Sequence, residues 1–312
     1  MKKLIALLLV LVMALSVVAC TSNSGTDSNP GTNQTPNTPI TPDTPETPAD
    51  AGPNADLVLD ENNMGVCPLC KGEPVQWIPL TNSNSQFGFV TDNWQLQESL
   101  GHRHIYLAED ITSTRENVWM AVRAKYNDVC LHLNNKTLNA YGDIRLANSV
   151  TFNIIGKGNV TYTSVLNPYM PTCGLGMFVV EQATLNIYGG TYTSEMPIVL
   201  TQKWGEPKIF IKGDASLSGA YVNLGTITVD EGAVIDKVEV AANPEREGKL
   251  GKLWVAKTFT GEIKSFTFPG EIADNKVPVD YGAAIGAFTG KVTTADGVAL
   301  AGSAGALTVA AQ

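Results

Sequence analysis

Two cysteines separated by two residues, Cys67 and Cys70, carry the clearest chemical signal in this sequence of 312 residues. The segment Cys67-Pro-Leu-Cys70-Lys-Gly has the spacing of a metal-binding knuckle, in which two thiolates bind one ion and the following turn directs N–H groups toward sulfur. Such a knuckle supplies only half of a tetrahedral zinc or iron site, so the other two ligands must come from distant parts of the chain.

Three other interpretations of the pair stay open. The two thiols form a disulfide if the protein is exported to an oxidising compartment. They form a redox centre if they precede a helix in a βαβ unit, although the surrounding residues lack that pattern. In the third interpretation, the two cysteines are unligated thiols, which is a common state of buried cysteines.

The N-terminus predicts an exported protein. Residues 1–19 combine two lysines, an apolar run and small residues before Cys20, which is the pattern of a secretory leader. The run Val-Val-Ala-Cys resembles the lipobox of bacterial lipoproteins, which implies that the Cys20 thiol is diacylated and becomes the mature N-terminus. The sequence therefore predicts a protein anchored by lipid to the outer side of the cell membrane and exposed at the surface.

Residues 20–55 predict the lipidated cysteine followed by a disordered tether. The segment is rich in Ser, Asn, Thr and Pro, and Thr-Pro recurs every three residues from 35 to 48. It has too few large apolar residues to fold, and its proline content favours extended polyproline II.

The remaining residues predict an all-β body. Short runs of apolar and β-branched residues are separated by Gly, Asn and Asp, and helical periodicity is absent. Apolar residues at the centres of similar runs mark one strand per coil: Leu133, Phe152, Leu185, Ile209 and Ile227. We expect a right-handed parallel β-helix, with a β-sandwich as the competing fold, and with a CxxC-containing N-terminal cap at 56–125 before coils and a C-terminal cap at 126–312.

An ordered series of motifs carries a resemblance to a known family. The series comprises Cys67-Pro-Leu-Cys70, Val75-Gln-Trp-Ile-Pro-Leu80, His104-Ile-Tyr-Leu-Ala-Glu-Asp-Ile111, Val129-Cys-Leu-His-Leu-Asn134 and Ala183-Thr-Leu-Asn-Ile-Tyr-Gly-Gly190. Between about 65 and 230 the chain resembles pectate-lyase-like β-helix surface lipoproteins of Gram-positive anaerobes. Most of these proteins have no established activity, so the resemblance implies a fold more than a function.

The resemblance also suggests how the metal site is completed. His104 opens one of the matching segments and Cys130 opens the next coil, so we expect Cys67, Cys70, His104 and Cys130 to bind a structural zinc or iron ion. Four protein ligands would leave no open position for a substrate. His102 and His132 are expected at the surface, and Cys173 is expected to be a buried or free thiol.

No catalytic constellation stands out. Acidic residues such as Asp128, Asp214, Asp230 and Asp236 fall at predicted turns, where carboxylates commonly accept backbone N–H groups. The motifs of serine hydrolases, zinc proteases and nucleotide-binding loops are absent. A polysaccharide lyase or glycoside hydrolase, whose carboxylates meet only in the folded protein, remains the alternative.

Binding is therefore the expected function, either of a glycan or of a surface protein, or else a structural role in the envelope. Tyr162 and Tyr192 occupy equivalent places in two Thr-Tyr-Thr-Ser repeats and are candidates for a stacking platform for sugar rings, or else for an ordinary aromatic stack. The net charge of −9 and the lack of a basic stripe argue against nucleic-acid binding.

Overall fold

The structure is a computed structural model, and it describes 15 stretches of the chain. They are residues 52–82, 103–112, 120–122, 128–141, 144–146, 149–163, 176–201, 205–241, 251–256, 258–267, 282–284, 289–295, 297, 299–303 and 306–309. The predicted leader, Cys20, residues 20–51 of the predicted tether, His102 and Cys173 lie outside these ranges. Within them, no helix has the length and apolar character needed to cross a membrane.

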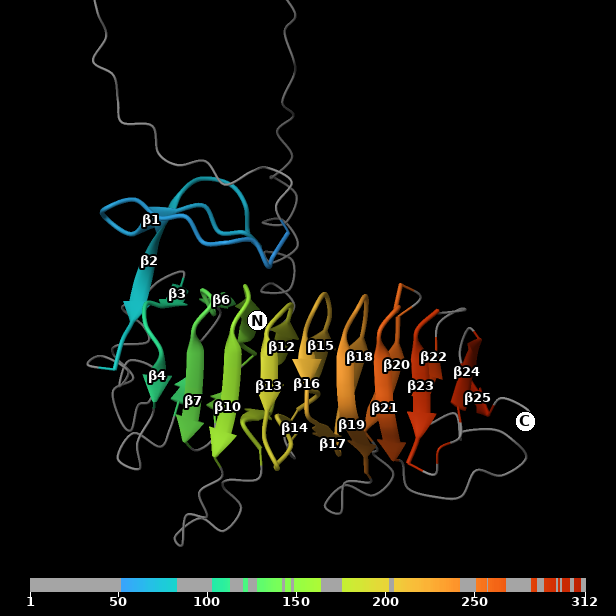
Figure 1. The fold of residues 1–312 in the computed structure, drawn as a ribbon. Helices are drawn as coiled ribbons and strands as arrows, with labels where there is room; N and C mark the ends of the chain where they lie inside the picture. The colour runs from blue at the N-terminus through green and yellow to red at the C-terminus, as the bar shows by residue number, and fades with distance from the viewer. Residues whose placement is uncertain are drawn as a thin grey trace, which may run out of the picture. The chain divides into compact units, whose positions relative to one another are not determined.

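The described chain consists of β-strands joined by turns, and most of them belong to two sheets (Figure 1). The first sheet, in spatial order, contains β1 (Met64–Gly65), β2 (Val75–Leu80), β3 (Arg103–Leu107), β6 (Asp128–His132), β9 (Thr151–Ile155), β12 (Thr184–Ile187), β15 (Lys208–Ile211), β18 (Thr226–Val229), β20 (Lys252–Val255) and β22 (Gly282–Ala284). From β2 onward, every neighbouring pair in this sheet is parallel.

The second sheet has two rows of strands that are connected through the long strand β19 (Val234–Val240). One row contains β4 (Ile111–Thr112), β7 (Thr137–Tyr141), β10 (Asn159–Thr163), β13 (Thr191–Thr193) and β16 (Ser216–Leu217). The other contains β5 (Met120–Val122), β8 (Ile144–Leu146), β11 (Phe178–Val180), β14 (Val199–Thr201) and β17 (Ala220–Val222). Strands β21 (Glu262–Thr267), β23 (Lys291–Thr294), β24 (Ala299–Ser303) and β25 (Ala306–Val309) extend this sheet toward the C-terminus.

The chain passes repeatedly from the first sheet through both rows of the second and back, so the fold is a parallel β-helix. The sequence order β12, β13, β14, β15 traces one such turn, and each strand pairs in parallel with its equivalent in the next turn. The prediction of an all-β parallel β-helix is confirmed.

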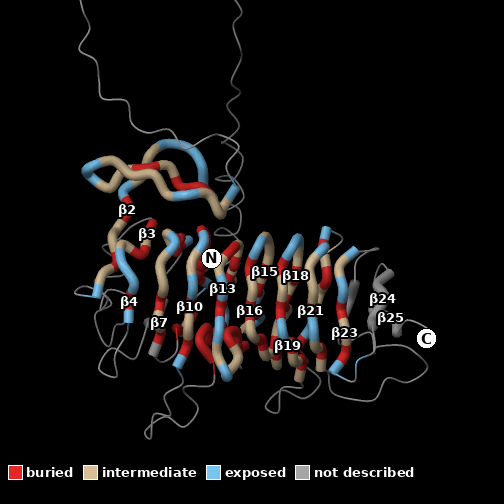
Figure 2. The backbone as a smooth tube through the Cα atoms, viewed as in Figure 1, coloured by how far each residue is buried: buried red, intermediate tan, exposed pale blue. Residues whose placement is uncertain are grey.

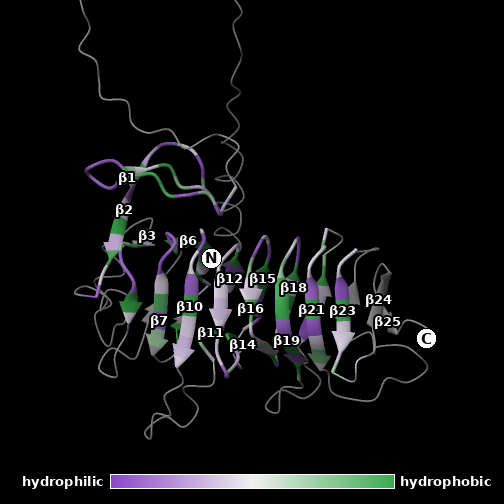
Figure 3. Cartoon of the chain, viewed as in Figure 1, coloured by the Kyte–Doolittle hydropathy of each residue, from purple (hydrophilic) through white to green (hydrophobic). Residues whose placement is uncertain are grey.

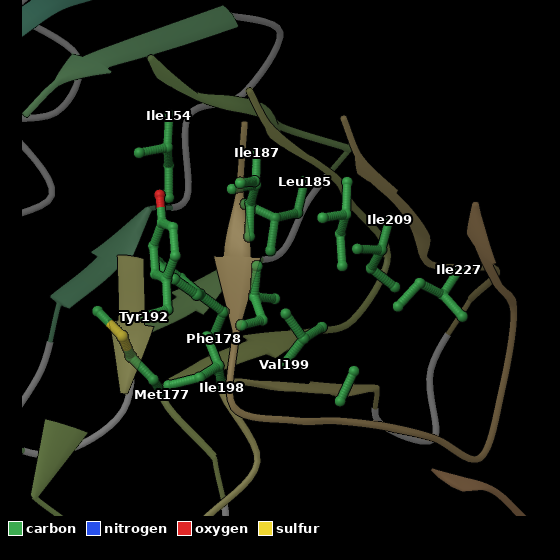
Figure 4. Close-up of a cluster of buried hydrophobic side chains, with 14 of the residues drawn as sticks. Ile154, Met177, Phe178, Leu185, Ile187, Tyr192, Ile198, Val199, Ile209 and Ile227 are labelled. Carbon is green, nitrogen blue, oxygen red and sulfur yellow. The ribbon is translucent and has the colours of Figure 1, made fainter. Parts of the chain in front are cut away.

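Side chains stack in register from coil to coil, as Figure 4 shows for Leu185, Ile209 and Ile227. Phe152 lies opposite Leu185 in the preceding coil, as predicted. The expected first member of the row is wrong, because Val129 is opposite Phe152 and Leu133 lies beyond the end of β6. Leu133 is nevertheless fully buried, since it packs at the corner where the chain leaves the first sheet.

Burial alternates along the strands because successive side chains point to opposite faces of a sheet (Figure 2). The inward residues form one continuous hydrophobic core that runs through the coils. Figure 3 shows hydrophobic and hydrophilic residues on the same strand, for example along β21. Each fully buried Ile or Leu contributes about 1.5–3 kcal/mol relative to an exposed position, and the backbone ladder holds these side chains together.

Left-handed residues let the chain turn sharply between the sheets. Asn134 has a φ of 52° after β6, and Gly190 has a φ of 94° after β12. A side chain at Gly190 would also collide with its neighbours, because an added Cβ would lie 2.6 Å from the Leu133 Cδ1. This corner therefore requires glycine for both its conformation and its packing.

Residues 52–74 form a small lobe, which contains β1 and lies over the outer face of the first coils. The predicted tether ends too late, because its last residues already belong to this lobe. The Gly156 N–H donates to the Pro53 carbonyl at 3.2 Å, and the Asn54 side-chain amide donates to the Tyr188 carbonyl at 2.8 Å. The parallel sheet itself begins with β2 and β3, inside the segment that the sequence assigns to the cap.

The C-terminal residues continue the solenoid and then change direction. Strand β22 pairs in parallel with β20, and β23 pairs in parallel with β21. Strands β24 and β25 then form antiparallel pairs that finish the second sheet. The sequence predicts this stretch to form thin last coils or an end cap, and its described strands include both parallel and antiparallel pairs.

Replacing Ile227 by alanine should lower the free energy of unfolding by about 2–5 kcal/mol, because it removes a fully buried side chain from the stacked row. Thr226→Ala is the matched control on the outer face of the same strand and should change stability by less than about 0.5 kcal/mol. Urea titration of both variants measures the difference. Equal losses would contradict the inward orientation of Ile227.

Candidate metal centre

The four predicted ligands come together in the structure. Cys67 and Cys70 belong to the lobe, His104 lies on β3 and Cys130 lies on β6. Their candidate ligand atoms all lie within 4.8 Å of one another. Among the residues that the structure describes, this is the one cluster of three or more His, Cys, Asp or Glu side chains with such geometry.

The register of the parallel strands explains half of the site. His104 lies opposite Cys130 on the neighbouring strand, and Trp77 lies opposite His104 on the other side. Side chains at one register position point to the same face of a sheet, here the outer face. The coil-to-coil stacking therefore delivers one imidazole and one thiol to adjacent points.

The lobe supplies the other two ligands through a tight turn. The Cys70 N–H donates to the Cys67 Sγ at 3.4 Å, and the Lys71 N–H donates to the Cys67 carbonyl at 2.9 Å. Lys71 then adopts a left-handed φ of 58°. The turn therefore directs one backbone N–H, that of Cys70, at the Cys67 sulfur, which is a feature of metal-binding knuckles.

Trp77 fixes the lobe to the sheet beside these ligands. Its ring is fully buried, its Nε1–H donates to the Gly65 carbonyl at 3.2 Å, and it meets the His104 ring edge-on with centroids 5.0 Å apart. The lobe and the first coils therefore share a second, smaller hydrophobic cluster, which includes Cys67 and Cys130.

The separation of the sulfur atoms fits shared coordination of one ion. The Cys70 Sγ and the Cys130 Sγ are 3.6 Å apart. Two thiolates with metal–sulfur bonds of about 2.3 Å on a tetrahedral ion are separated by about 3.8 Å. A disulfide would require about 2.05 Å, and Cys67, Cys70 and Cys130 are all free thiols.

The surroundings of His104 also fit a ligand. The residue is 7% exposed, and neither ring nitrogen has a hydrogen-bond partner. A buried imidazole without a partner is costly unless something binds it. A metal ion held by the three neighbouring sulfurs would satisfy one of its nitrogens.

An outer contact supports Cys130. The Asn153 side-chain amide approaches the Cys130 Sγ at 3.8 Å, and its oxygen accepts a hydrogen bond of 2.8 Å from the Asn186 amide. Asn153 and Asn186 occupy the same outward register position as Cys130 in the next two coils. An N–H group directed at sulfur stabilises a thiolate, as outer contacts in metal sites commonly do.

The cluster is electrostatically coupled. Hydrogen bonding with Cys130 and Cys70 holds the pKa of the Cys67 thiol far below its usual range, while the same contact with Cys67 raises the pKa of Cys130. Burial works to lower the pKa of His104, but the Cys67 and Cys70 thiols outweigh it and raise the pKa to about 9. Without a metal, the site therefore favours a thiolate beside an imidazolium.

His132 does not join the site, and its predicted surface position is wrong. It is 1% exposed because the lobe covers it. The Asn134 N–H donates to its Nδ1 at 2.9 Å, so its Nε2–H donates to the Ala55 carbonyl at 3.0 Å. Burial lowers the pKa of His132, which keeps the ring neutral in this bridge between β6 and the lobe.

The proposed stacking platform of Tyr162 and Tyr192 is wrong. The two side chains are 6% and 1% exposed, and Figure 4 shows the Tyr192 ring among core residues. Tyr192 lies opposite Val160 rather than Tyr162, so the rings do not align in register. The Tyr192 hydroxyl donates to the Gly189 carbonyl at 2.9 Å, which satisfies its polar atom inside the core.

Several carboxylates hold turns, as predicted for Asp230. Its Oδ1 accepts the Glu231 N–H at 2.7 Å and contacts the Thr258 hydroxyl. Asp110 accepts the Thr137 N–H at 2.7 Å, and Asp60 accepts two N–H groups of the lobe. Asp236 instead forms an exposed ion pair with Lys264 at 2.7 Å.

Sequence reasoning missed two supporting residues of the metal centre, Trp77 and Asn153. It also missed a basic and aromatic surface on strands β15 and β20. The alternation Lys208-Ile-Phe-Ile-Lys212 was available as a signal, because its polar and aromatic members fall on the face opposite the core.

Comparisons of this chain with protein-family models, with curated proteins and with solved structures find no match.

The pKa of His104 predicts a pH-dependent contribution to the stability of the metal-free protein. A folded-state pKa raised to about 9 stabilises the fold below pH 6.5, and this contribution is lost as the pH rises through about 9. The difference in unfolding free energy between the wild type and His104→Gln should therefore shrink from pH 7 to pH 10, as measured by urea titration with chelator and reductant.

His132→Gln is the matched control. Because the pKa of His132 is lowered, its ring stays neutral throughout this range and the offset from wild type should be constant. A constant offset for His104→Gln as well would contradict the coupling of His104 to the thiols.

Proposed function

We propose that Cys67, Cys70, His104 and Cys130 bind one zinc ion as a structural clip. The observation that carries this proposal is the convergence of three thiols and one unpartnered imidazole within 4.8 Å. A sulfur-rich tetrahedral donor set suits zinc, and iron is the other ion that such a set accepts. Four protein ligands complete the coordination, which favours a structural role over a catalytic one.

The position of the site suggests what the clip does. Cys67 and Cys70 come from the lobe that directly follows the predicted tether, while His104 and Cys130 come from successive coils. A bound ion would therefore join the entry of the chain to the body of the β-helix. Any force that the tether transmits would then act on an N-terminal lobe that the metal ion cross-links to the β-helix.

The sequence supports a place for this body at the cell surface. The leader, Cys20 and the Thr/Pro-rich segment together are typical of a lipoprotein that displays a folded domain away from the membrane. We propose an extracytoplasmic, lipid-anchored protein on this basis.

Within that setting, the β-helix is proposed to bind a glycan without cleaving it. The support is the use of four described carboxylates: Asp60, Asp110 and Asp230 accept backbone N–H groups, and Asp236 is paired with a lysine. Carboxylates with these partners stabilise turns and are not positioned as general acids or bases. Binding of a surface protein is the other non-catalytic role that such a body could serve.

Metal analysis of the purified full-length protein tests the clip. We expect about one equivalent of zinc in the wild type and zinc that a chelator removes more readily in Cys130→Ala, because that variant has lost one of the four donors. Cys173→Ala is the matched control and should keep its zinc, because Cys173 is not one of the four ligands. A wild type without metal and with an oxidised Cys67–Cys70 pair would contradict the proposal, as would iron in place of zinc.

A polysaccharide panel tests the absence of cleavage. The protein, with and without Ca²⁺, should retain a glycan and release neither unsaturated products nor new reducing ends. Product from any substrate would contradict the non-catalytic role and favour a lyase or hydrolase. A folded protein that retains no polysaccharide would favour a protein partner.

A further inference from the structure

The outer face of the first sheet changes character beyond the lobe. On strands β12 to β20, the outward positions carry three lysines and three aromatic rings, here called the Lys–aromatic face. Its members are Tyr188, Lys208, Phe210, Lys212, Lys252 and Trp254.

The register spaces these side chains regularly. Phe210 lies opposite Thr228, which in turn lies opposite Trp254, so the two rings are two strands apart. At about 4.8 Å per strand, that separation is about 10 Å. Lys208 and Lys252 flank the rings with the same two-strand separation, through Thr226.

The lysines on this face form no ion pair of 4.0 Å or less with an acidic residue that the structure describes. Lys208 and Lys252 are exposed, and neither forms an ion pair with a described residue. Lysines of the second sheet differ in this respect: they are paired as Lys237 with Glu239, Lys264 with Asp236, and Lys291 with Glu262. In a chain of net charge −9, Lys208 and Lys252, which form no ion pair with a described residue, give this face a local positive charge.

Lys212 is held over the aromatic rings. Its Nζ lies 5.0 Å from the centroid of Tyr188 and 5.4 Å from that of Phe210. Asp230 follows the neighbouring strand at the equivalent position and keeps its negative charge, but it forms no ion pair of 4.0 Å or less with Lys212. The face therefore combines cationic groups with partly exposed rings in a fixed arrangement.

The lobe defines where this face begins. Tyr188 packs against the small cluster that includes Cys130, and its carbonyl accepts a hydrogen bond from Asn54. Earlier coils are covered on this side, whereas Phe210 and Trp254 are only half-buried. Two ligands of the metal centre, His104 and Cys130, thus lie on the same outer sheet surface as the Lys–aromatic face.

We propose that the Lys–aromatic face binds an acidic polysaccharide. The inference rests on the proposed glycan-binding function and names its site and ligand chemistry. Sugar rings would stack on Phe210 and Trp254, and carboxylates or sulfates would pair with Lys208 and Lys252. Hydroxyls of Thr226 and Thr228, which lie between them, are available to hydrogen-bond the sugar.

A nucleic acid fits this face less well. Its affinity depends on neutralising a dense row of phosphates, and the rest of this acidic chain would repel it. A polysaccharide with spaced charges and apolar ring faces matches both components of the surface.

The test measures retention of the full-length protein on immobilised hyaluronan and alginate, with dextran as the neutral polymer. Wild type should bind the two acidic polymers, with affinity that falls as salt is raised. Lys208→Gln/Lys252→Gln and Phe210→Ala/Trp254→Ala should each weaken binding by about tenfold or more.

Lys237→Gln/Lys264→Gln is the matched control, since it also removes two charges but from the second sheet. It should bind as wild type does. Urea titration of every variant verifies that it is folded. If the aromatic double variant is unstable, the lysine double variant still tests the site, because glutamine replaces lysine with a side chain of similar length.

Two results would overturn this inference while leaving the glycan-binding function intact. One is binding of acidic polymers that neither the lysine nor the aromatic changes weaken. The other is equal binding of dextran and the acidic polymers. If nothing on a wider polysaccharide panel is retained, the proposed glycan-binding function fails together with this site. Retention of duplex DNA but of no polysaccharide would also overturn it.

Discussion

The parallel register between successive coils is the constraint on which the rest of this structure depends. Because each strand hydrogen-bonds in step with the next, residues at one position form straight columns inside and outside the solenoid. Inside, one column contains Phe152, Leu185, Ile209 and Ile227. Outside, another contains Trp77, His104, Cys130, Asn153 and Asn186, followed by Phe210, Thr228 and Trp254. This outer column supplies His104 and Cys130 to the metal centre and Phe210 and Trp254 to the Lys–aromatic face.

Much of the fold could be predicted from sequence because the columns leave a local trace. Runs such as Thr-Leu-Asn-Ile at 184–187 and Thr-Ile-Thr-Val at 226–229 alternate in polarity and end at turns. The coil register was harder to infer, because turn lengths vary between coils. Leu133 was placed in the inner row for this reason, although Val129 occupies the equivalent position.

The ligand set was predictable for a different reason. Cys and His are scarce in this sequence, and the two cysteines of the knuckle leave two ligand positions of a tetrahedral ion to be filled. The environment of single side chains was not predictable in the same way. The alternation of polar and apolar residues along a strand separates its two faces, but it does not show whether another part of the chain buries the outer face. His132 faces away from the main core but is buried under the lobe. Tyr162 and Tyr192 point inward while the threonines beside them face out.

X-ray absorption spectroscopy at the zinc edge of the metal-loaded, full-length protein tests the central claim most directly. We expect three sulfurs at about 2.3 Å and one nitrogen at about 2.0 Å around the zinc, from Cys67, Cys70, Cys130 and His104. A shell with two or fewer sulfurs, or one dominated by oxygen, would contradict it. That result would mean that the lobe and the first two coils do not share one ion.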